Sequence, residues 1–336
     1  MKTFRTALAA LAATVVAGAS WASDKVVFGT NWLAQGGHGG FYQALADGTY
    51  EKYGLDVEIR MGGPQMNNRP MLAAGRLDFL MAGNLLLSFD NVRNGIPTTV
   101  VAAFFQKDPQ AVMAHQGHYA DFAALTEAPT VLVSKDGQFS FWQWMVDAHG
   151  FRDEQIRPYG FNLAQFLEDK DLVQQAYGTA EPLYAAAQGA EVDTFLLADH
   201  GWNTYSTTIE TRQQLIEEDP ELVQRFIDAS IEGWYNFLYG DRTAAYEAII
   251  AANPEMTAEK LDKEIAQFEK LGIIDTGDAL EMGIGAMTDA RIKAFHDLAV
   301  QSGIIEEGTV ELSKVADTGF VNKGHGLDIK SRLTGG

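Results

Sequence analysis

Short apolar runs alternate with segments of helical periodicity along the first third of the chain, and this alternation constrains the fold most. Runs rich in β-branched and aromatic residues predict strands, and apolar residues three or four positions apart predict helices. The repeated strand–helix order predicts an α/β fold with a mainly parallel sheet that helices cover on both faces. In chain order we expect strand 26–30, helix 41–53, strand 55–61, helix 71–74, strand 78–82, helix 85–93 and strand 98–105.

The segment Gln106–Pro109 breaks this pattern, and a second α/β series follows it. The polar and aromatic segment 199–205 should carry the chain back, and from Asp219 onward the chain should be helical, with helix starts at Pro220 and Pro254. The predicted strands of the second series are 111–114, 130–134, 172–175 and 194–198, and its helices are 141–149, 163–168 and 182–188.

A chain of this length exceeds what one hydrophobic core supports, so we expect two lobes. Residues 23–105 would form the first part of lobe 1, residues 106–200 lobe 2, and residues 201–336 the return to lobe 1 with C-terminal helices. Two crossings between α/β lobes make a two-strand hinge, which is typical of a clamp that closes on a ligand.

Residues 1–22 have the pattern of an export signal. Lys2 and Arg5 precede a short apolar run over 7–17, and Ser20-Trp21-Ala22 places small residues where a signal peptidase reads, so we expect cleavage after Ala22. The alternatives are an uncleaved anchor or a buried helix. The apolar run is about half as long as a membrane span, and no later stretch approaches that length.

The chain contains no cysteine, which excludes a lipoprotein anchor, disulfides, thiolate metal sites and cysteine nucleophiles. Its formal net charge of −20 disfavours nucleic acid and anionic lipid as partners. Nucleophile-elbow, zinc-protease and nucleotide-binding motifs are also missing. His115 and His118 have the spacing of metal ligands, but no further ligands cluster near them in the sequence. We therefore expect no enzyme activity, no cofactor and no metal.

Several segments together resemble one protein family, over nearly the whole chain after the signal. Each motif is weak alone, but their order and spacing are fairly specific. By these segments the chain is similar to the NMT1/THI5-like periplasmic binding proteins, which are related to thiamine-pyrimidine synthases. The segments are Asn31-Trp32 with 38–42 (HGGFY), 54–57 (GLDV), 73–79 (AAGRLDF), 106–110 (QKDPQ), 156–159 (IRPY), and 174–177 (QQAY) with 179–182 (TAEP).

The resemblance implies a type II periplasmic binding protein fold with a ligand cleft between two α/β lobes. It also implies a monomer in the periplasm that delivers a small molecule to the permease of an ABC importer in the inner membrane. Similar members are linked to thiamine pyrimidine precursors of the hydroxymethyl- or formylaminopyrimidine type. The alternatives are riboflavin, a sulfonate or a nitrate-like ion as cargo, a synthase-like enzyme, or a binder that feeds a chemoreceptor.

One departure bears on the cargo. Relatives often carry Thr-Ser-Glu-Pro where this chain has Thr179-Ala180-Glu181-Pro182, so one hydroxyl group that could bond a ligand is missing here. The synthase of the family relies on a cysteine-rich iron motif, which a chain without cysteine cannot form.

A planar heterocycle needs aromatic faces and a few placed donors and acceptors, and lobe 1 concentrates such groups where its strands end. Asn31 would bond a ring edge and Trp32 would stack, although a turn residue and a core residue are the alternatives. His38 lies between glycine pairs and would bond a ring nitrogen or a carboxylate, unless it is a solvent-facing loop residue. Further candidates are Tyr42 at a helix start, Gly63 at a strand end and Asn84 at a helix N-cap.

In lobe 2, Ser140 is expected to cap the helix that contains Phe141, Trp142 and Trp144, and one of these rings would line the slot while the other two form core. Tyr177 and Glu181 belong to the segments of resemblance. Glu181 would accept a hydrogen bond from an exocyclic amine, and its alternative is a capping carboxylate. Asp199 on the returning crossover would close the cleft, unless it only packs the hinge.

Overall fold

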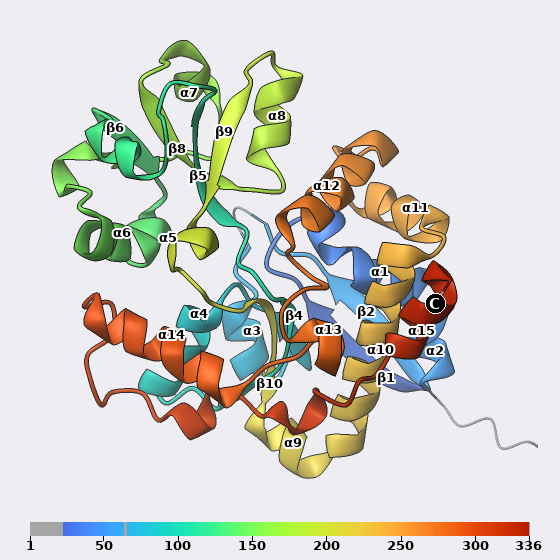
Figure 1. Cartoon of the computed structure of the whole chain (residues 1–336). Helices are drawn as coiled ribbons and strands as arrows, with labels where there is room; N and C mark the ends of the chain where they lie inside the picture. The colour runs from blue at the N-terminus through green and yellow to red at the C-terminus, as the bar shows by residue number, and fades with distance from the viewer. Residues whose placement is uncertain (1–22, 64–65, 336) are drawn as a thin grey trace, which may run out of the picture.

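The computed structural model describes residues 23–63 and 66–335 and contains two five-stranded sheets (Figure 1). The strand order is β2-β1-β3-β10-β4 in the first sheet and β7-β6-β8-β5-β9 in the second. We call the halves built on these sheets lobe 1 and lobe 2. The predicted signal segment, residues 1–22, lies outside the described residues.

In lobe 1, β1 (Asp24–Gly29) pairs in parallel with β2 (Leu55–Arg60) and with β3 (Phe79–Met81). A strand from much later in the chain, β10 (Ser206–Arg212), lies antiparallel between β3 and β4 (Thr98–Phe105). The prediction of a parallel sheet is thus right for β1 to β3, but β10 separates β3 from β4. We did not predict β10, because its residues STTIETR have no apolar alternation although six of the seven are buried.

In lobe 2, β6 (Thr130–Val133) pairs in parallel with β7 (Ile156–Pro158) and β8 (Leu172–Tyr177). The first strand of this lobe, β5 (Gln110–His115), runs antiparallel to β8 and to β9 (Val192–Leu196). Four of the five strands overlap their predicted ranges, and β7 was not predicted because it has only three residues.

The first predicted helix of lobe 1, 41–53, is two helices, α1 (Gly39–Ala46) and α2 (Thr49–Lys52). Gly48, with φ of 77°, separates them, and the Asp47 carboxylate accepts hydrogen bonds from the Thr49 amide and hydroxyl groups. The 3₁₀ turn η1 (Gly36–His38) precedes α1, and lobe 1 also contains α3 (Arg69–Ala73) and α4 (Leu85–Arg93).

Lobe 2 has its predicted helices, but not the predicted cap. Ser140 precedes α6 (Phe141–His149) without capping it, because its hydroxyl group donates to the carbonyl oxygen of Asp136 at 2.9 Å. The preceding α5 (Lys135–Gln138) is capped instead by Ser134, whose hydroxyl oxygen accepts a hydrogen bond from the Gly137 amide. The other helical segments are η2 (Ala123–Glu127), η3 (Asp153–Gln155), α7 (Ala164–Glu168), α8 (Glu181–Ala187) and η4 (Leu197–His200).

After β10 the chain is helical, as predicted from Asp219 onward. Pro220 starts α10 (Pro220–Tyr239), but Pro254 starts no helix, because α12 (Ala258–Leu271) begins four residues later behind the cap of Thr257. The remaining segments are α9 (Gln213–Glu218), α11 (Thr243–Ala252), α13 (Ala279–Met282), α14 (Asp289–Gln301), η5 (Leu312–Lys314), η6 (Thr318–Phe320) and α15 (Leu327–Thr334).

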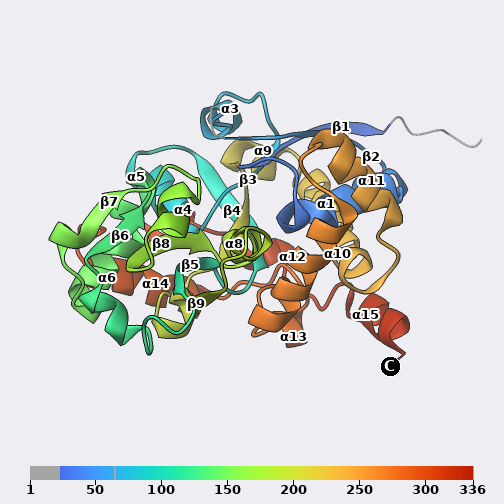
Figure 2. The ribbon, with the colours of Figure 1, turned by 90° about the horizontal axis from the view of Figure 1, so that it is seen from above.

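Stacked aromatic rings fill the core of lobe 1 between its sheet and α10. Phe226 of α10 stacks on Phe79 of β3 with ring centroids 4.0 Å apart, and it also meets Phe28 of β1 edge to face at 5.3 Å. Phe28 in turn contacts Phe41 of α1. These rings hold α10 against strands that precede it by about 150–200 residues, so the last third of the chain completes lobe 1 (Figure 2).

The chain crosses between the sheets twice, from β4 to β5 and from β9 to β10. Arg291 of α14 ties the two crossings together: its guanidinium group donates to the carbonyl oxygen of Gln106 in the first crossing and to Oδ1 of Asn203 in the second. The same group lies over the ring of Tyr205, 4.1 Å from its centre. Together the two crossings have the connectivity of a two-strand hinge.

Within the described ranges 23–63 and 66–335, every helix is too short or too polar to cross a lipid bilayer.

Gly233 allows α10 to approach α1 closely. A Cβ atom at this position would lie 2.3 Å from the Gly40 carbonyl oxygen and 2.6 Å from Cβ of Ala44. We predict that Gly233→Ala lowers the free energy of unfolding by about 1–3 kcal/mol, because this clash exceeds the helix-propensity gain of about 1 kcal/mol. Urea unfolding measures the change. In the control, Gly160→Ala, the new methyl group meets only the movable amide of Asn162, so a loss as large as that of Gly233→Ala would contradict the packing argument.

Candidate functional site

A cavity of about 900 Å³ lies between the lobes and takes its walls from both. Its size is within the range of small-molecule sites. Side chains of lobe 1 and the C-terminal region line one side, and the loops of lobe 2 line the other. The apolar side chains that line this cavity include Trp32, Met66, Leu86, Phe139, Phe161 and Ile304.

Aromatic rings from the two lobes face each other at this cavity. Trp32, which follows β1, and Phe161, which follows β7, have ring centroids 6.0 Å apart and planes tilted by 39°. Phe161 also contacts Tyr159, with centroids 5.0 Å apart. Phe161 is 61% exposed and has φ of 55°, so its ring is held on the surface of lobe 2 by an unusual backbone conformation. Trp32 was predicted as a site residue and Phe161 was not.

Glu181 lies at the start of α8, behind these rings. Its Oε2 accepts a hydrogen bond from the Tyr177 amide at 2.7 Å, and its Oε1 accepts one from the Tyr159 hydroxyl group at 3.3 Å. Burial raises the pKa of this carboxyl group. The carboxylate thus has a strong bond on one oxygen and a weak bond on the other, which leaves the second oxygen available to a better donor.

The loop between β1 and α1 contains Asn31 and His38. Asn31 is exposed, while His38 is 1% exposed, and His38 Nε2 lies 3.5 Å from Asn31 Oδ1. Burial lowers the pKa of His38 to about 4, so this ring is neutral near pH 7. Its Nδ1 is buried and has no hydrogen-bond partner. The alternative of a solvent-facing His38 is therefore wrong, because the glycines on either side let the loop pack tightly against α10 and α12.

Tyr42 and Gly63 occupy different surroundings in lobe 1. Tyr42 is 4% exposed in α1, and burial raises the pKa of its hydroxyl group to about 12. Gly63 lines the cavity between the lobes and pairs through its backbone with Met66.

Asn84 joins lobe 1 to the hinge. Its Oδ1 accepts a hydrogen bond from the Leu86 amide, which confirms the predicted N-cap, and its Nδ2 donates to Oδ2 of Asp108 at 3.1 Å. Asp108 is 3% exposed, and burial raises its pKa. Burial also raises the pKa of Tyr177, and the nearby Asp108 charge adds to this effect. Tyr177 and Asn84 thus approach the same buried hinge carboxyl group from opposite lobes.

Asp199 forms an ion pair across the two crossings, with its Oδ1 2.6 Å from Nζ of Lys107. Both groups are partly exposed, so the pair contributes at most about 1 kcal/mol. The Lys107 ammonium group also donates to the carbonyl oxygen of Leu271 at 3.3 Å. These contacts place Asp199 at the outside of the hinge.

Two predicted residues of lobe 2, Phe141 and Trp142, do not gather with the others. Phe141 is buried beside Val133 and Gly137, and Trp142 is buried with its Nε1 donating to Asp153 Oδ1 at 2.9 Å. Both rings belong to the interior of lobe 2. Ser140 does line the cavity, but its hydroxyl group is bonded to the backbone within its own loop.

Sequence reasoning also missed three polar residues near the cleft, Asp108, Tyr184 and Glu264. Glu264 is 2% exposed and accepts hydrogen bonds from the Gly36 amide and from the Tyr184 hydroxyl group. The segment DKEIAQFEK around Glu264 is typical of a solvated helix face, so its sequence carries no signal of burial.

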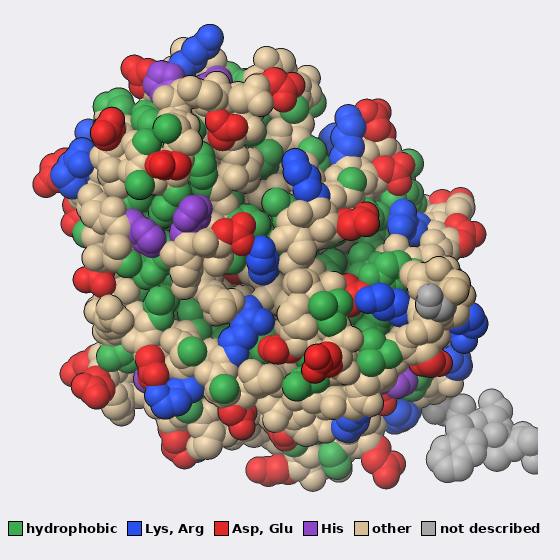
Figure 3. All heavy atoms as spheres, in the orientation of Figure 1, with side chains coloured by type: hydrophobic (Ala, Val, Ile, Leu, Met, Phe, Trp, Pro, Cys, Tyr) green, Lys and Arg blue, Asp and Glu red, His purple; other side chains and the backbone are tan. Residues whose placement is uncertain are grey.

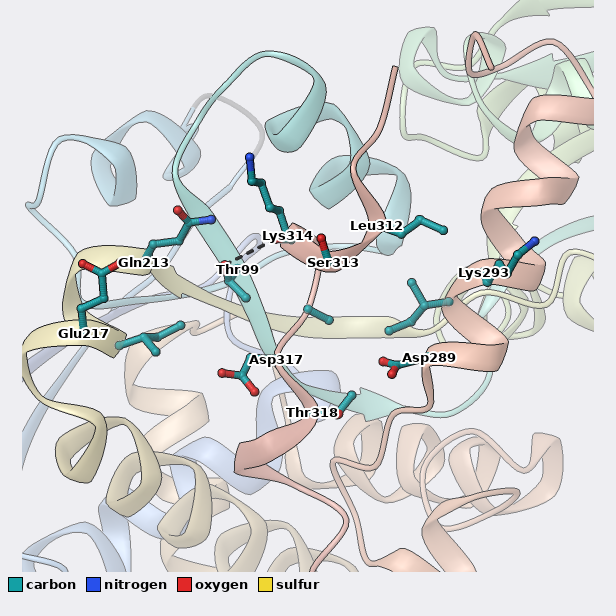
Figure 4. Close-up of a pocket in the computed structure, with 13 residues that line it drawn as sticks. Thr99, Gln213, Glu217, Asp289, Lys293, Leu312, Ser313, Lys314, Asp317 and Thr318 are labelled. Atoms are coloured by element: carbon teal, nitrogen blue, oxygen red, sulfur yellow. Dashed lines mark hydrogen bonds between the residues drawn. The ribbon is translucent and has the colours of Figure 1, made fainter. Parts of the chain in front are cut away.

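A second cavity, of about 640 Å³, lies on lobe 1 between β4, α9, α14 and the segment 312–318 (Figure 4). Gln213 and Glu217 reach it from α9, and Asp289 and Lys293 from α14. It contacts β4 at Thr99, the opposite end from the crossing. Since ligands of open α/β sheets bind beyond the carboxyl ends of parallel strands, the cavity between the lobes is the better candidate.

Charged side chains of both signs are interspersed over the face of the molecule in Figure 3. Among the carboxyl groups described above, Asp108, Glu181 and Glu264 make no ion pair within the described residues. In the same part of the chain, no three His, Asp or Glu side chains lie close enough to hold a metal ion.

The buried His38 makes stability depend on pH. Its pKa of about 4 lies below the ordinary value of 6.5, so the unfolded chain takes up a proton between these values and the folded chain does not. We predict that between pH 7.5 and pH 4 the free energy of unfolding falls by about 3 kcal/mol more in the wild type than in His38→Gln. Urea unfolding at several pH values measures this difference. Parallel pH profiles of the two proteins would show that His38 is accessible to protons.

The riboflavin-binding protein RibY of Chloroflexus aurantiacus is 28% identical over 148 residues, which are 42% of this chain and 41% of that protein. The chain therefore spans less than half the length of this curated relative.

Solved structures of the same fold cover far more of the chain. The periplasmic aliphatic sulphonate binding protein SsuA of Escherichia coli matches with a TM-score of 0.62 at 13% identity, over 88% of this chain and 92% of that one. The desulfurization enzyme DSZB matches with a TM-score of 0.57 at 14% identity, over 90% of this chain and 98% of that one. At such identities the similarity shows the fold alone, which is that of the periplasmic binding proteins.

The family is shown by sequence. The sequence profile of the family described as NMT1/THI5 like matches residues 35–263, which is more than half of the chain and includes the loop of His38, the hinge and the start of α8. This chain is therefore a member of the NMT1/THI5-like family.

Proposed function

We propose that this chain is the substrate-binding component of an ABC importer and that it captures a small planar nitrogen heterocycle, of the thiamine pyrimidine precursor type, between its lobes. The single observation that carries this proposal is the pair of ring faces, Trp32 and Phe161, presented from opposite lobes across a two-strand hinge. RibY and SsuA, which are named as binders of riboflavin and of sulphonates, support the role of a solute-binding protein.

The proposal includes the remaining expectations from the sequence. The chain would be exported by a signal segment over 1–22 and act in the periplasm as a monomer. Residues 23–105 and 201–336 would move as one lobe against residues 106–200. The closed form would then dock on the permease in the inner membrane.

The aromatic pair is spaced slightly more closely than a slot that holds one ring between two others. One ring between two others needs about 7 Å between the outer rings, since stacked carbon atoms lie about 3.5 Å apart. Trp32 and Phe161 are 6.0 Å apart and tilted by 39°. A small rotation of the lobes about the hinge therefore opens the slot, and a flat ring fills it.

Acidic groups near the slot favour a guest that brings hydrogen-bond donors. Glu181 offers the oxygen that Tyr159 bonds only weakly, and an exocyclic amine is a suitable donor for it. The arginines of the cavity are occupied: Arg69 donates to the Leu87 carbonyl oxygen and to Asn91, and Arg93 pairs with Asp90. This charge balance supports an aminopyrimidine over a sulfonate or a nitrate-like ion.

Riboflavin is the second candidate, because the cavity of about 900 Å³ is larger than one pyrimidine ring requires and RibY is named for that ligand. An enzyme activity is not proposed, although DSZB shares the fold. A chemoreceptor in place of the permease would use the same clamp.

A ligand panel tests the proposal. We predict that 4-amino-5-hydroxymethyl-2-methylpyrimidine binds with micromolar or tighter affinity, because the slot and Glu181 complement its ring and its amine. At one hundred times its Kd, such a ligand raises the free energy of unfolding by about 2.7 kcal/mol, which a thermal-shift assay detects. Isothermal titration gives the affinity, and X-ray scattering with and without ligand reports closure.

The panel also includes riboflavin, a purine, an alkanesulfonate and nitrate. Preferential binding of riboflavin supports the second candidate, and preferential binding of the sulfonate contradicts the charge argument. A chain that binds none of these compounds contradicts the proposal as a whole.

Glu181 provides a test at one residue. We predict that Glu181→Ala weakens binding of the aminopyrimidine by about 1–3 kcal/mol, because the exocyclic amine loses its acceptor. Glu181→Gln keeps one acceptor oxygen and should lose less. The matched control is Glu191→Ala, an exposed carboxylate of the same lobe, and titration calorimetry measures all three. Equal affinity of Glu181→Ala and the wild type removes Glu181 from the site.

A further inference from the structure

Glu264 of α12 is a buried carboxyl group that contacts both lobes. Its Oε2 accepts a hydrogen bond of 2.6 Å from the Gly36 amide, in the loop that leads from Trp32 to α1. Its Oε1 accepts one of 3.4 Å from the hydroxyl group of Tyr184, which belongs to α8 of lobe 2. In Figures 1 and 2, α8 and α12 face each other across the space between the lobes.

The loop is built to receive this carboxyl group. A Cβ atom at position 36 would lie 2.6 Å from Oε2 of Glu264 and 3.1 Å from its Cβ, so only glycine allows the approach. At the neighbouring Gly37 the nearest atoms to such a Cβ are 3.8 Å away. The close contact with Glu264 therefore requires glycine at position 36, whereas position 37 has room for a Cβ atom.

We propose that Glu264 is a positioning residue of the clamp: it bonds the loop of lobe 1 through Gly36 and contacts α8 of lobe 2 through Tyr184. Closure of the lobes then depends on whether this carboxyl group carries a proton. The inference rests on the proposed function, because it concerns how the two ligand-bearing segments come together. His38 shares the 3₁₀ turn with Gly36, and Glu181 opens the helix that contains Tyr184.

The charged and titratable groups around Glu264 come from both lobes. The pKa of Glu264 is raised to about 7, chiefly by burial, and the Glu181 carboxylate of lobe 2 contributes to this rise. The Gly36 amide, the Tyr184 hydroxyl group and Lys260 lower it. Glu255 acts on Tyr184 and raises the pKa of its hydroxyl group, while His38 in the loop is neutral at these pH values.

The sign of the pH effect follows from this arrangement. When the lobes separate, water reaches the carboxyl group and Glu181 moves away, so the pKa of Glu264 falls toward its ordinary value of 4.5. The closed form therefore takes up a proton at pH values between 4.5 and 7. Closure is favoured as the pH falls through 7, and it is disfavoured above 7, where the buried group is ionised.

The first experiment needs no ligand. The ¹³Cδ signal of Glu264, assigned by its absence in Glu264→Gln, is followed by NMR as the pH changes. We predict a midpoint near 7, which Glu181→Gln lowers and Tyr184→Phe raises, although both residues belong to the other lobe. Tyr119→Phe, a control in lobe 2 whose hydroxyl group bonds only the Asp171 carbonyl oxygen, leaves the midpoint unchanged. A midpoint near 4.5, or a midpoint that neither Glu181→Gln nor Tyr184→Phe changes, overturns the proposal.

The second experiment measures affinity against pH, with 4-amino-5-hydroxymethyl-2-methylpyrimidine and riboflavin as probes. Between pH 7.5 and pH 6, affinity in the wild type should tighten by about three- to eightfold more than in Glu264→Gln, which mimics the protonated group. Gly36→Ala should weaken binding and Gly37→Ala should not. Equal pH profiles of the wild type and Glu264→Gln contradict the proposal while the proposed function stands. If neither probe binds, the proposed function fails, and the ligand-free titration decides the role of Glu264.

Discussion

The chain passes between its two sheets twice, and this double crossing is the constraint on which the rest of the structure depends. Because β9 returns the chain to lobe 1, β10 must enter a sheet that already contains β1 to β4, and it does so antiparallel between β3 and β4. The C-terminal helices then have only lobe 1 to cover. Arg291 of α14 bonds both crossings, so the region that completes lobe 1 also braces the hinge.

Three polar atoms of the candidate segments have incomplete hydrogen bonds. His38 Nδ1 has no partner, Glu181 Oε1 has a bond of 3.3 Å, and Glu264 Oε1 has a bond of 3.4 Å. Buried polar atoms left in this way cost free energy unless another molecule or a proton satisfies them. The carboxyl groups of Glu181 and Glu264, together with the aromatic pair Trp32 and Phe161, are the features on which the proposed recognition of a flat, donor-bearing guest rests.

Local sequence signals predicted the elements whose stabilising contacts lie between neighbouring residues. The helix 85–93 and the strand 98–105 have the predicted bounds, because an N-cap and a continuous run of β-branched and aromatic residues are properties of neighbouring residues. The break at Gly48 and the late start of α12 were missed, because Asp47 and Thr257 offered side-chain bonds that competed with helix continuation. For the site, strand ends pointed to Trp32, which lines the cavity between the lobes. The pattern of α6 could not tell that Phe141 and Trp142 face the interior of lobe 2.

The sequence by itself determined two α/β series, the point where the first ends at Gln106–Pro109 and the resemblance to one family, because these depend on local periodicity and on residues in order. Only the tertiary structure decided that STTIETR becomes a buried strand, that Phe161 meets Trp32 and that Glu264 is buried between Gly36 and Tyr184. The physical reason is that each of these outcomes joins groups up to about 230 residues apart, whose burial and hydrogen bonds exist only once the two lobes have been assembled.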